Sequence, residues 1–385
     1  MNFEEKEQLC EDNICEKELT NSYKKYKIAV YAICKNEEKF VDRWFNSMKE
    51  ADAIYVLDTG STDNTVKKLK KNKVNVKVKK IDPWRFDVAR NESLKLIPDF
   101  YDICVCTDLD EVFTPGWRNT LEQLWDNETT RIKYNYNWSF DEYNNPSVNF
   151  YIEKIHARKN YKWIHPVHEV LTYLNGEEKI KTTDLITLNH YPDYTKSRSS
   201  YLPLLELSVK EQPNDDRNVH YLGREYMYYG KWNECIDTLI KHLNLPTATW
   251  KDERCASMRF IARSYKNLKR YDEAKMWLDK AMEEAPYLRD PFVERALLEY
   301  ELKNWNEVIK YGSLALQIVS HPKSYINEPF SFNETIFDIL SIAYFELKDY
   351  KKSLEFVTKA LEKSPNNERI KNNKIIIEKI VSKLN

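Results

Sequence analysis

Three carboxylates crowd one short stretch of the chain, "VCTDLDEVF" at residues 105–113. Asp108, Asp110 and Glu111 fall within four positions, directly after an apolar segment that is typical of a buried strand. Like charges this close repel one another, and each costs free energy where water is scarce. Either water screens them in a surface turn, or a divalent cation such as Mg²⁺ or Mn²⁺ neutralises them. A D-x-D triplet alone does not separate these alternatives.

The stretch lies in an alternating pattern of strands and helices. Apolar runs typical of strands occupy residues 27–34, 53–58 and 102–107, and residues 74–80 alternate with period two, as a strand does. Segments with helical periodicity occupy 38–51, 65–72 and 86–97. This alternation predicts a mostly parallel sheet covered by helices on both faces. Ligands of such sheets bind beyond the carboxyl ends of the strands. Asp58 and Asp108 follow two such ends, so we expect both to face a ligand.

The pattern changes between residues 130 and 192. The segments "TRIKYNYNWSF", "VNFYIEKIHARK" and "IKTTDLITLNHY" are longer and more polar than the preceding strands. They predict an antiparallel addition to the sheet.

From about residue 214 the chain is helical and repetitive. Trp232, Tyr271, Trp305 and Tyr350 begin equivalent segments at spacings of 39, 34 and 45 residues. Small residues recur at two equivalent positions, the first being Gly223, Ala262, Ala296 and Ser341, and the second Ala281, Ala315 and Ala360. This pattern predicts about four tetratricopeptide repeats, with inserted turns at 245–253 and 321–333 and a closing helix from 366. The alternative is a generic helical bundle.

Composition excludes several classes of protein. Sixty basic and sixty-one acidic residues nearly cancel, so charge gives no sign of nucleic-acid binding. No apolar run approaches the roughly 20 residues that a transmembrane helix needs, and the acidic first residues predict no secretory signal. Seven scattered cysteines suit a reducing cytoplasm, and Cys34, Cys104 and Cys106 fall within apparent strands. Cys104 and Cys106 are expected to be small core residues rather than ligands.

Four motifs together resemble family 2 glycosyltransferases, which are nucleotide-sugar enzymes of the GT-A fold. They are "YAICKNEEKFV", "VLDTGSTDNT", "FDVARNESL" and "DFYDICVCTDLDE", in the order and spacing of that family. With the repeats, the chain resembles bacterial family 2 enzymes that include the S-glycosyltransferases of bacteriocin peptides. The resemblance implies an α/β GT-A catalytic domain, Rossmann-like, followed by an all-α repeat array. We expect an N-terminal segment at 1–25, the catalytic domain at 26–213 and the array at 214–385.

The resemblance also implies roles at the donor site. Glu37 and Asp58 match acids that recognise the nucleoside, and Arg90 and Asn91 match an element near the donor. Asp108 is expected beside the ribose and the metal. Three of these assignments have a structural alternative: Glu37 begins a helix, Asp58 caps a turn, and Arg90 forms a buried salt bridge.

Two further roles follow from the same resemblance. Asp110 is expected to bind Mn²⁺ or Mg²⁺ directly, with His190 completing the site in preference to His165 or His168. Glu169 lies where the family places the general base of an inverting transfer. The family commonly has two adjacent acids there, whereas here His168 precedes Glu169. A thiol acceptor, which is more acidic than a hydroxyl, would need the base less.

The leading hypothesis is therefore a cytoplasmic, metal-dependent glycosyltransferase that uses a nucleotide-diphosphate sugar, expected to be a UDP-sugar. The repeats favour a protein or peptide acceptor, because helical arrays commonly bind extended chains, and they offer a surface for homo-oligomers. Two alternatives remain: a transferase that acts on polysaccharide or lipid-linked glycan, and a repeat scaffold with a catalytically idle sugar-nucleotide domain. We expect neither a nucleic-acid partner nor a transmembrane segment.

Overall fold

The computed structural model describes residues 25–193, 195 and 201–384 of the chain, so the predicted N-terminal segment 1–25 lies almost wholly outside the described residues. The chain divides into two compact units. The first contains the residues up to Tyr136, Ile152–Ile164 and Val170–Pro192, and the second contains Asn137–Tyr151, His165–Glu169 and the residues from Asp193 onward. The sequence pattern placed the domain boundary at 213/214, whereas these units group helix α6, Tyr201–Glu211, with the repeats.

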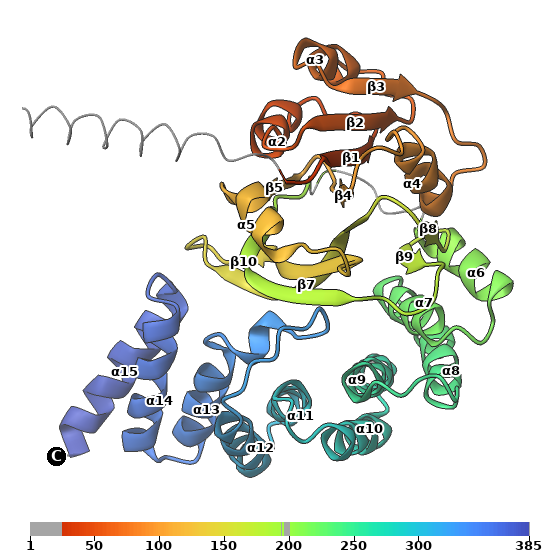
Figure 1. Ribbon diagram of the computed structural model, residues 1–385. Coiled ribbons are helices and arrows are strands. Elements are labelled where there is room, and N and C mark those ends of the chain that lie inside the picture. The colour runs from red at the N-terminus through yellow and green to blue at the C-terminus, as the bar shows by residue number, and fades with distance from the viewer. Residues whose placement is uncertain (1–24, 194, 196–200, 385) are drawn as a thin grey trace, which may run out of the picture. The chain divides into compact units, whose positions relative to one another are not determined.

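An eight-stranded sheet in the order β3-β2-β1-β4-β7-β6-β10-β5 organises the first half of the chain (Figure 1). Its parallel strands are β1 Ile28–Cys34, β2 Ala53–Asp58, β3 Asn75–Val78 and β4 Ile103–Cys106. The other four are β5 Glu111–Phe113, β6 Arg131–Phe140, β7 Pro146–Ala157 and β10 Ile180–His190. The β4–β7 and β10–β5 pairs are antiparallel, which confirms the predicted antiparallel addition. A separate hairpin, β8 Tyr161–Ile164 with β9 Val170–Tyr173, and the short β5 were not predicted.

The apolar residues of the strands and helices explain the core of the first unit. All seven residues of β1 are buried, as expected for a parallel strand covered on both faces. Cys104 and Cys106 are two positions apart on β4, so their side chains share one face of the strand. Both belong to one buried cluster, which confirms that they are core residues. The helices of this unit are α2 Val41–Met48, α3 Thr65–Lys71, α4 Phe86–Leu94 and α5 Trp117–Leu124. Helix α2 buries Val41, Trp44 and Met48, which share one face at helical spacing.

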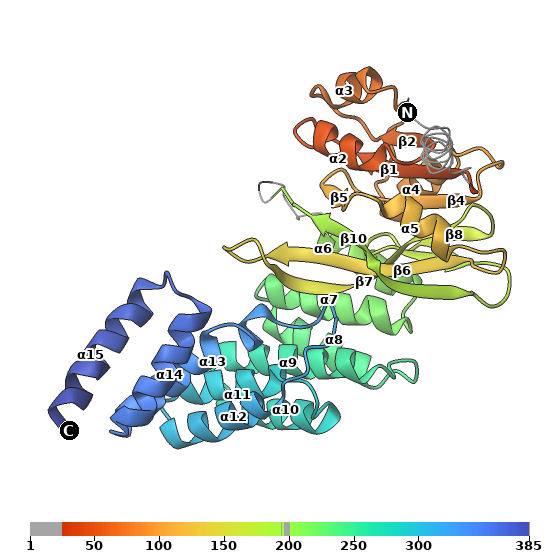
Figure 2. The same cartoon turned by 60° about the vertical axis from the view of Figure 1, so that its left-hand side comes forward.

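The second half is an array of antiparallel helix pairs (Figures 1 and 2). The pairs are α7 Asp216–Tyr228 with α8 Trp232–Leu243, α9 Lys251–Asn267 with α10 Tyr271–Glu284, α11 Asp290–Glu301 with α12 Trp305–Gln317, and α13 Thr335–Glu346 with α14 Tyr350–Lys363; α15 Glu368–Leu384 follows. Each second helix begins at the predicted aromatic residue, Trp232, Tyr271, Trp305 or Tyr350. At the first of the predicted small positions, a Cβ on Gly223 would collide with the side chain of Leu239, so the residue must be small for α7 and α8 to pack.

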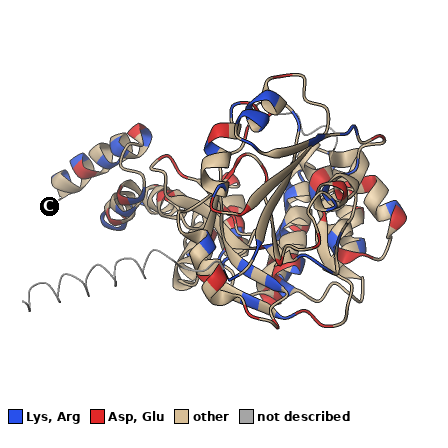
Figure 3. Ribbon diagram, turned by 45° about the horizontal axis from the view of Figure 1, so that its top comes forward, with Lys and Arg blue, Asp and Glu red and all other residues tan. Residues whose placement is uncertain are grey.

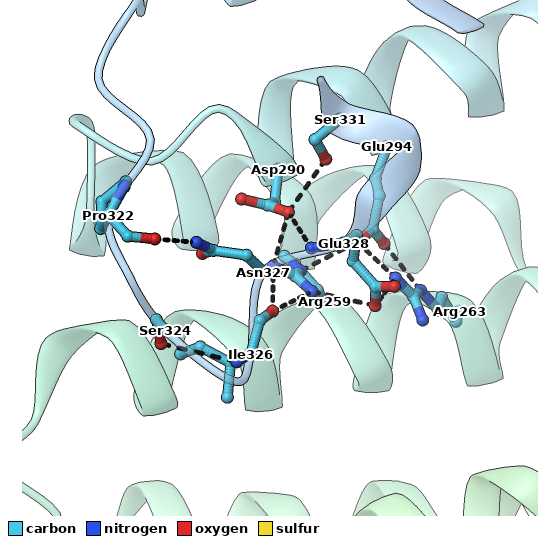
Figure 4. Close-up of polar contacts among 10 residues, drawn as sticks. All are labelled: Arg259, Arg263, Asp290, Glu294, Pro322, Ser324, Ile326, Asn327, Glu328 and Ser331. Carbon is cyan, nitrogen blue, oxygen red and sulfur yellow. Dashed lines mark hydrogen bonds and ion pairs between the residues drawn. The ribbon is translucent and has the colours of Figure 1, made fainter. Parts of the chain in front are cut away.

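Residues 318–334, which we term the insertion loop, link α12 to α13 and fold back over α9 and α11 (Figure 4). Arg259 of α9 is 1% exposed and lies 2.8 Å from Glu294 of α11 and 3.2 Å from Glu328 of the loop. Asp290 accepts hydrogen bonds from the Glu328 N–H at 2.8 Å and from the Ser331 hydroxyl at 2.9 Å. Buried charges need such partners, so this network fixes the loop to the array.

Charged residues of both signs are interspersed on the same helices (Figure 3). Among the helices that the structure describes, none is long and apolar enough to cross a lipid bilayer.

Candidate functional site

The loops that follow β1 and β2 are cross-linked by side chains. Asn36 lies in the left-handed region with φ 56° and accepts a hydrogen bond from the Thr62 N–H at 2.8 Å. The N–H of Asn36 donates to Ser61 Oγ at 2.8 Å, and the N–H of Glu37 donates to Thr65 Oγ1 at 2.8 Å. These contacts hold Glu37 at the carboxyl edge of the parallel strands, where a ligand of this sheet class would bind.

Asp58, the last residue of β2, is fully buried. Its carboxylate accepts hydrogen bonds from the N–H groups of Gly60 at 3.0 Å and Ser61 at 2.9 Å, and from the Ser61 hydroxyl. Asp58 therefore holds the turn after β2, which is the structural alternative considered for this residue. A ligand that used the same carboxylate would have to share it with this turn.

Asp108 follows β4 and forms ion pairs with two cations from distant segments. Arg90 of α4 is 4% exposed, and its Nη2 lies 2.7 Å from Asp108 Oδ1. Lys154 of β7 approaches the other oxygen at 3.2 Å. Burial alone would raise the pKa of Asp108, but Arg90 and Lys154 hold it well below its ordinary value. Arg90 therefore forms the buried salt bridge that was the structural alternative to a role in donor binding.

Glu111 is the most buried carboxylate of the triad, at 1% exposure. It lies 3.2 Å from Lys154 Nζ, accepts a hydrogen bond from the Tyr136 hydroxyl at 2.7 Å, and accepts one from the Asp108 N–H at 2.8 Å. Burial raises the pKa of Glu111 even though Lys154 opposes the shift. Sequence reasoning assigned no role to Glu111, Lys154 or Tyr136. The position of Glu111 in the acidic stretch was the available signal.

Asn91 is engaged by the backbone of β8. Its side-chain amide donates to the Trp163 carbonyl at 2.8 Å, and its side-chain oxygen accepts from the Trp163 N–H at 3.0 Å. The predicted donor-site residue therefore also braces α4 against the β8–β9 hairpin.

Asp110 and His190 are brought together although 80 positions separate them in the sequence. His190 ends β10 and is paired with Glu111 of β5, while the Tyr191 N–H donates to the Asp110 carbonyl at 2.9 Å. These backbone contacts place His190 Nε2 3.5 Å from Asp110 Oδ2. Two ligands of one metal ion, each about 2.1 Å from it, lie about 3 to 3.5 Å apart, so the pair fits a shared divalent cation.

The charges around this pair also suit a metal ion. Asp108 and Glu111 lie beside Arg90 and Lys154, and Asp110 lies beside His190. When all three carboxylates are ionised, they exceed the two cations Arg90 and Lys154 by one charge. A divalent cation would reverse the sign of the cluster and make it attractive to a diphosphate.

The predicted base, Glu169, is half-buried in the loop between β8 and β9. This loop, His165–Glu169, is grouped with the repeats and not with the sheet. His165 and His168 both have positive φ, 74° and 50°, a strained conformation for residues other than glycine that is often found at functional sites. Another histidine, His156, is a core residue whose pKa burial lowers to about 3.

Comparison with known proteins supports both halves of this description. The family described as glycosyl transferase family 2 matches residues 29–172, and the tetratricopeptide repeat family matches residues 260–287. A comparison with curated proteins found no match.

Solved structures similar to the chain include repeat proteins of low sequence identity. The crystal structure of MamA is 17% identical with a TM-score of 0.36, and the match covers 46% of this chain and 99% of that chain. The APC/C hetero-tetramer Cut9–Hcn1 is 15% identical with a TM-score of 0.38, over 48% of this chain and 33% of that chain. The thermophilic repeat protein TTC0263 of Thermus thermophilus is 18% identical with a TM-score of 0.33, over 46% of this chain and 89% of that chain.

The parallel strands with their acidic carboxyl edge and the helix pairs that begin at predicted aromatic residues agree with the two family matches. Residues 29–172 form a glycosyl transferase family 2 domain, and a tetratricopeptide repeat array follows it in the same chain.

Proposed function

We propose that this chain is a metal-dependent, inverting glycosyltransferase that moves a sugar from a UDP-sugar to a side chain of a protein or peptide. The observation that carries the proposal is the approach of Asp110 to His190, 3.5 Å apart. Asp110 and the neighbouring Asp108 lie within the family-matched residues 29–172, and His190 follows them in the chain. Asp110 and His190 would hold Mn²⁺ or Mg²⁺. The bound cation would neutralise charge that develops on the leaving diphosphate.

The donor roles follow from the positions of the other residues. Glu37 and Asp58 lie at the ends of β1 and β2 and would recognise the nucleoside. Asp108 would bind the ribose, and Arg90 holds this carboxylate ionised through their 2.7 Å ion pair. Arg90 thereby supports the donor site through Asp108, and Asn91 supports it by bracing α4.

Transfer needs a base on the acceptor and stabilisation of the leaving group. In the proposed step the Glu169 carboxylate removes the proton from the acceptor hydroxyl or thiol as that atom attacks the anomeric carbon. The bond between the anomeric carbon and the diphosphate oxygen breaks, and the nucleoside diphosphate leaves with the electron pair. Attack from the side opposite to the leaving group inverts the anomeric configuration. Lys154, 3.2 Å from Asp108, would add a positive charge to this site.

The repeats support a protein or peptide acceptor, because helical arrays commonly bind extended chains. In this array the insertion loop already covers polar side chains of α9 and α11, including Arg259, Arg263 and Glu294. An acceptor would therefore bind elsewhere on the array or contact the loop itself.

The direct test is a screen of nucleotide sugars followed by analysis of acceptors. UDP-, GDP-, CMP- and dTDP-sugars are incubated with the protein and Mn²⁺, and nucleotide release is measured. Candidate peptides with Cys, Ser or Thr side chains are then examined by intact-mass spectrometry for the added sugar. The proposal predicts release from a UDP-sugar and a mass increase of one sugar on a peptide. Transfer only to lipid-linked glycan would instead support the alternative acceptor class, and binding without release or transfer would support the idle scaffold.

A further inference from the structure

We infer that the first helix of the repeat array positions the general base: Asn218 and Tyr221 of α7 act on Glu169 through His165 and His168. This inference rests on the proposed function, because it takes Glu169 as the base. It assigns the array a part in the chemical step in addition to acceptor binding. The contacts that support it all lie within the second compact unit.

His165 is fixed at one end of the loop by the beginning of α7. Its Nδ1 lies 3.0 Å from the side-chain nitrogen of Asn218, and its Nε2 lies 3.6 Å from Asp215 Oδ2. With the Asn218 side-chain nitrogen as donor, His165 Nδ1 is the acceptor and the ring proton on Nε2 faces Asp215. Asp215 is itself fixed, because it caps α7 by accepting the Asn218 N–H at 2.8 Å.

His168, the residue before Glu169, is fixed by stacking. Its ring lies flat on the ring of Tyr221, with centroids 4.0 Å apart and planes inclined by 10°. Tyr325 of the insertion loop stacks on Tyr221 at 6.0 Å and 18°. Tyr221 therefore contacts an aromatic ring of the predicted base loop and one of the insertion loop.

Tyr221 and Tyr325 each have further partners. The guanidinium groups of Arg217 and Arg224 lie 4.9 Å and 4.5 Å from the centre of the Tyr221 ring. The Tyr325 hydroxyl donates to Glu253 of α9 at 2.7 Å, and Glu253 Oε1 lies 3.3 Å from His242 Nε2. Tyr221 and Asn218 are 5% and 1% exposed, respectively.

The loop needs this support because its backbone is strained. Positive φ at His165 and His168 places both residues in a sparsely populated conformation, which persists only where neighbours enforce it. Without the contacts from α7 the backbone would relax, and Glu169 would move with it. A general base that is misplaced by about 1 Å can lose on the order of a hundredfold in rate.

The test compares Tyr221→Ala and Asn218→Ala with two controls in the full-length chain. Tyr221→Phe keeps the stacking ring, and Tyr311→Ala removes a similarly buried tyrosine of α12. We expect Tyr221→Ala and Asn218→Ala to lower the turnover of transfer by about ten- to a hundredfold. Tyr221→Phe and Tyr311→Ala should stay within about twofold of wild type. UDP affinity, measured by calorimetric titration, should be unchanged in all four variants.

A purely structural role would not show coupling to Glu169. In the Glu169→Gln background, Tyr221→Ala should lower turnover no further, because the group that it positions is already inactive. Wild-type turnover in folded Tyr221→Ala and Asn218→Ala would overturn the inference. An equal loss of turnover in Tyr311→Ala would also overturn it. So would a further loss of turnover when Tyr221→Ala is added to Glu169→Gln. If Glu169→Gln alone keeps wild-type turnover, the base assignment fails and the positioning role fails with it. An inactive Glu169→Gln beside an active Tyr221→Ala rejects only the positioning role.

Discussion

Lys154 Nζ lies 3.2 Å from Glu111 Oε1, and this carboxylate is 1% exposed. Lys154 also approaches Asp108, so one cation from β7 holds together two acids of the triad after β4. A deeply buried carboxylate with one cationic partner makes a clear prediction about stability and pH.

Lys154→Met should lower the free energy of unfolding at neutral pH by about 3 kcal/mol, since it removes the cationic partner that Asp108 and the deeply buried Glu111 share. The pKa of Glu111 is already raised by burial and should rise further in the variant. A group whose folded-state pKa is raised contributes stability below its unfolded pKa, and this stability is lost as the pH rises through the folded pKa. The deficit should therefore shrink between pH 7 and about pH 5, while Asp108, whose pKa is lowered, stays ionised.

Urea unfolding of wild type and variant at the two pH values measures this deficit, with Lys154→Arg as the charge-preserving control. An identical deficit at both pH values would show that Glu111 is not the group that Lys154 stabilises.

Glu169→Gln should lower the turnover of transfer by at least about a hundredfold, because the amide keeps the size of the side chain but cannot accept the proton. UDP affinity should hardly change, since the proposed nucleotide contacts are Glu37, Asp58 and the metal. Single-turnover transfer and UDP titration measure the two quantities separately. Loss of both together would make Glu169 a ligand or structural residue, and loss of neither would place the base elsewhere or point to a thiol acceptor.

Arg259→Met should destabilise the array by about 3 to 5 kcal/mol, because Glu294 and Asp290 would lose a cation that is 1% exposed. The insertion loop should also become a site of protease cleavage, since Glu328 loses one of its two arginine partners. Urea unfolding and limited proteolysis test the two effects.

The matched control for Arg259→Met is Lys266→Ala, on the same helix. Lys266 pairs with Glu301 at 2.7 Å, but the two side chains are 34% and 50% exposed, so the loss should stay below about 1 kcal/mol. Equal losses in the two variants would contradict a special role for the buried network.

Periodic patterns of apolar and aromatic residues predicted the parallel strands and the helix pairs. The second helix of each pair begins at Trp232, Tyr271, Trp305 or Tyr350, because an aromatic at a fixed register fills the gap between paired helices. The strands before Asp58 and Asp108 were also predicted, since buried parallel strands have continuous apolar runs. Strand β5 was missed because three residues carry no periodic signal.

Long-range contacts were not predictable from the same patterns. Lys154 meets Asp108 only because β7 pairs with β4 in one register. Asn91 contacts Trp163 across 72 positions, and His168 contacts Tyr221, which lies 53 positions later in the chain. The Asp110–His190 pair was expected from the family resemblance, and the register of β10 on β5 is what places the two residues 3.5 Å apart.

The most direct measurement of the central claim is nucleotide release from a UDP-sugar in Mn²⁺ and in excess chelator, for wild type and for Asp110→Ala. Thermal melting of both proteins checks that the substitution leaves the fold intact. We expect release by wild type in Mn²⁺, with loss of at least about a hundredfold in chelator or in Asp110→Ala, since the charge of the leaving diphosphate would no longer be neutralised. Undiminished release in chelator, or by the folded Asp110→Ala variant, would contradict the metal site at Asp110 and His190.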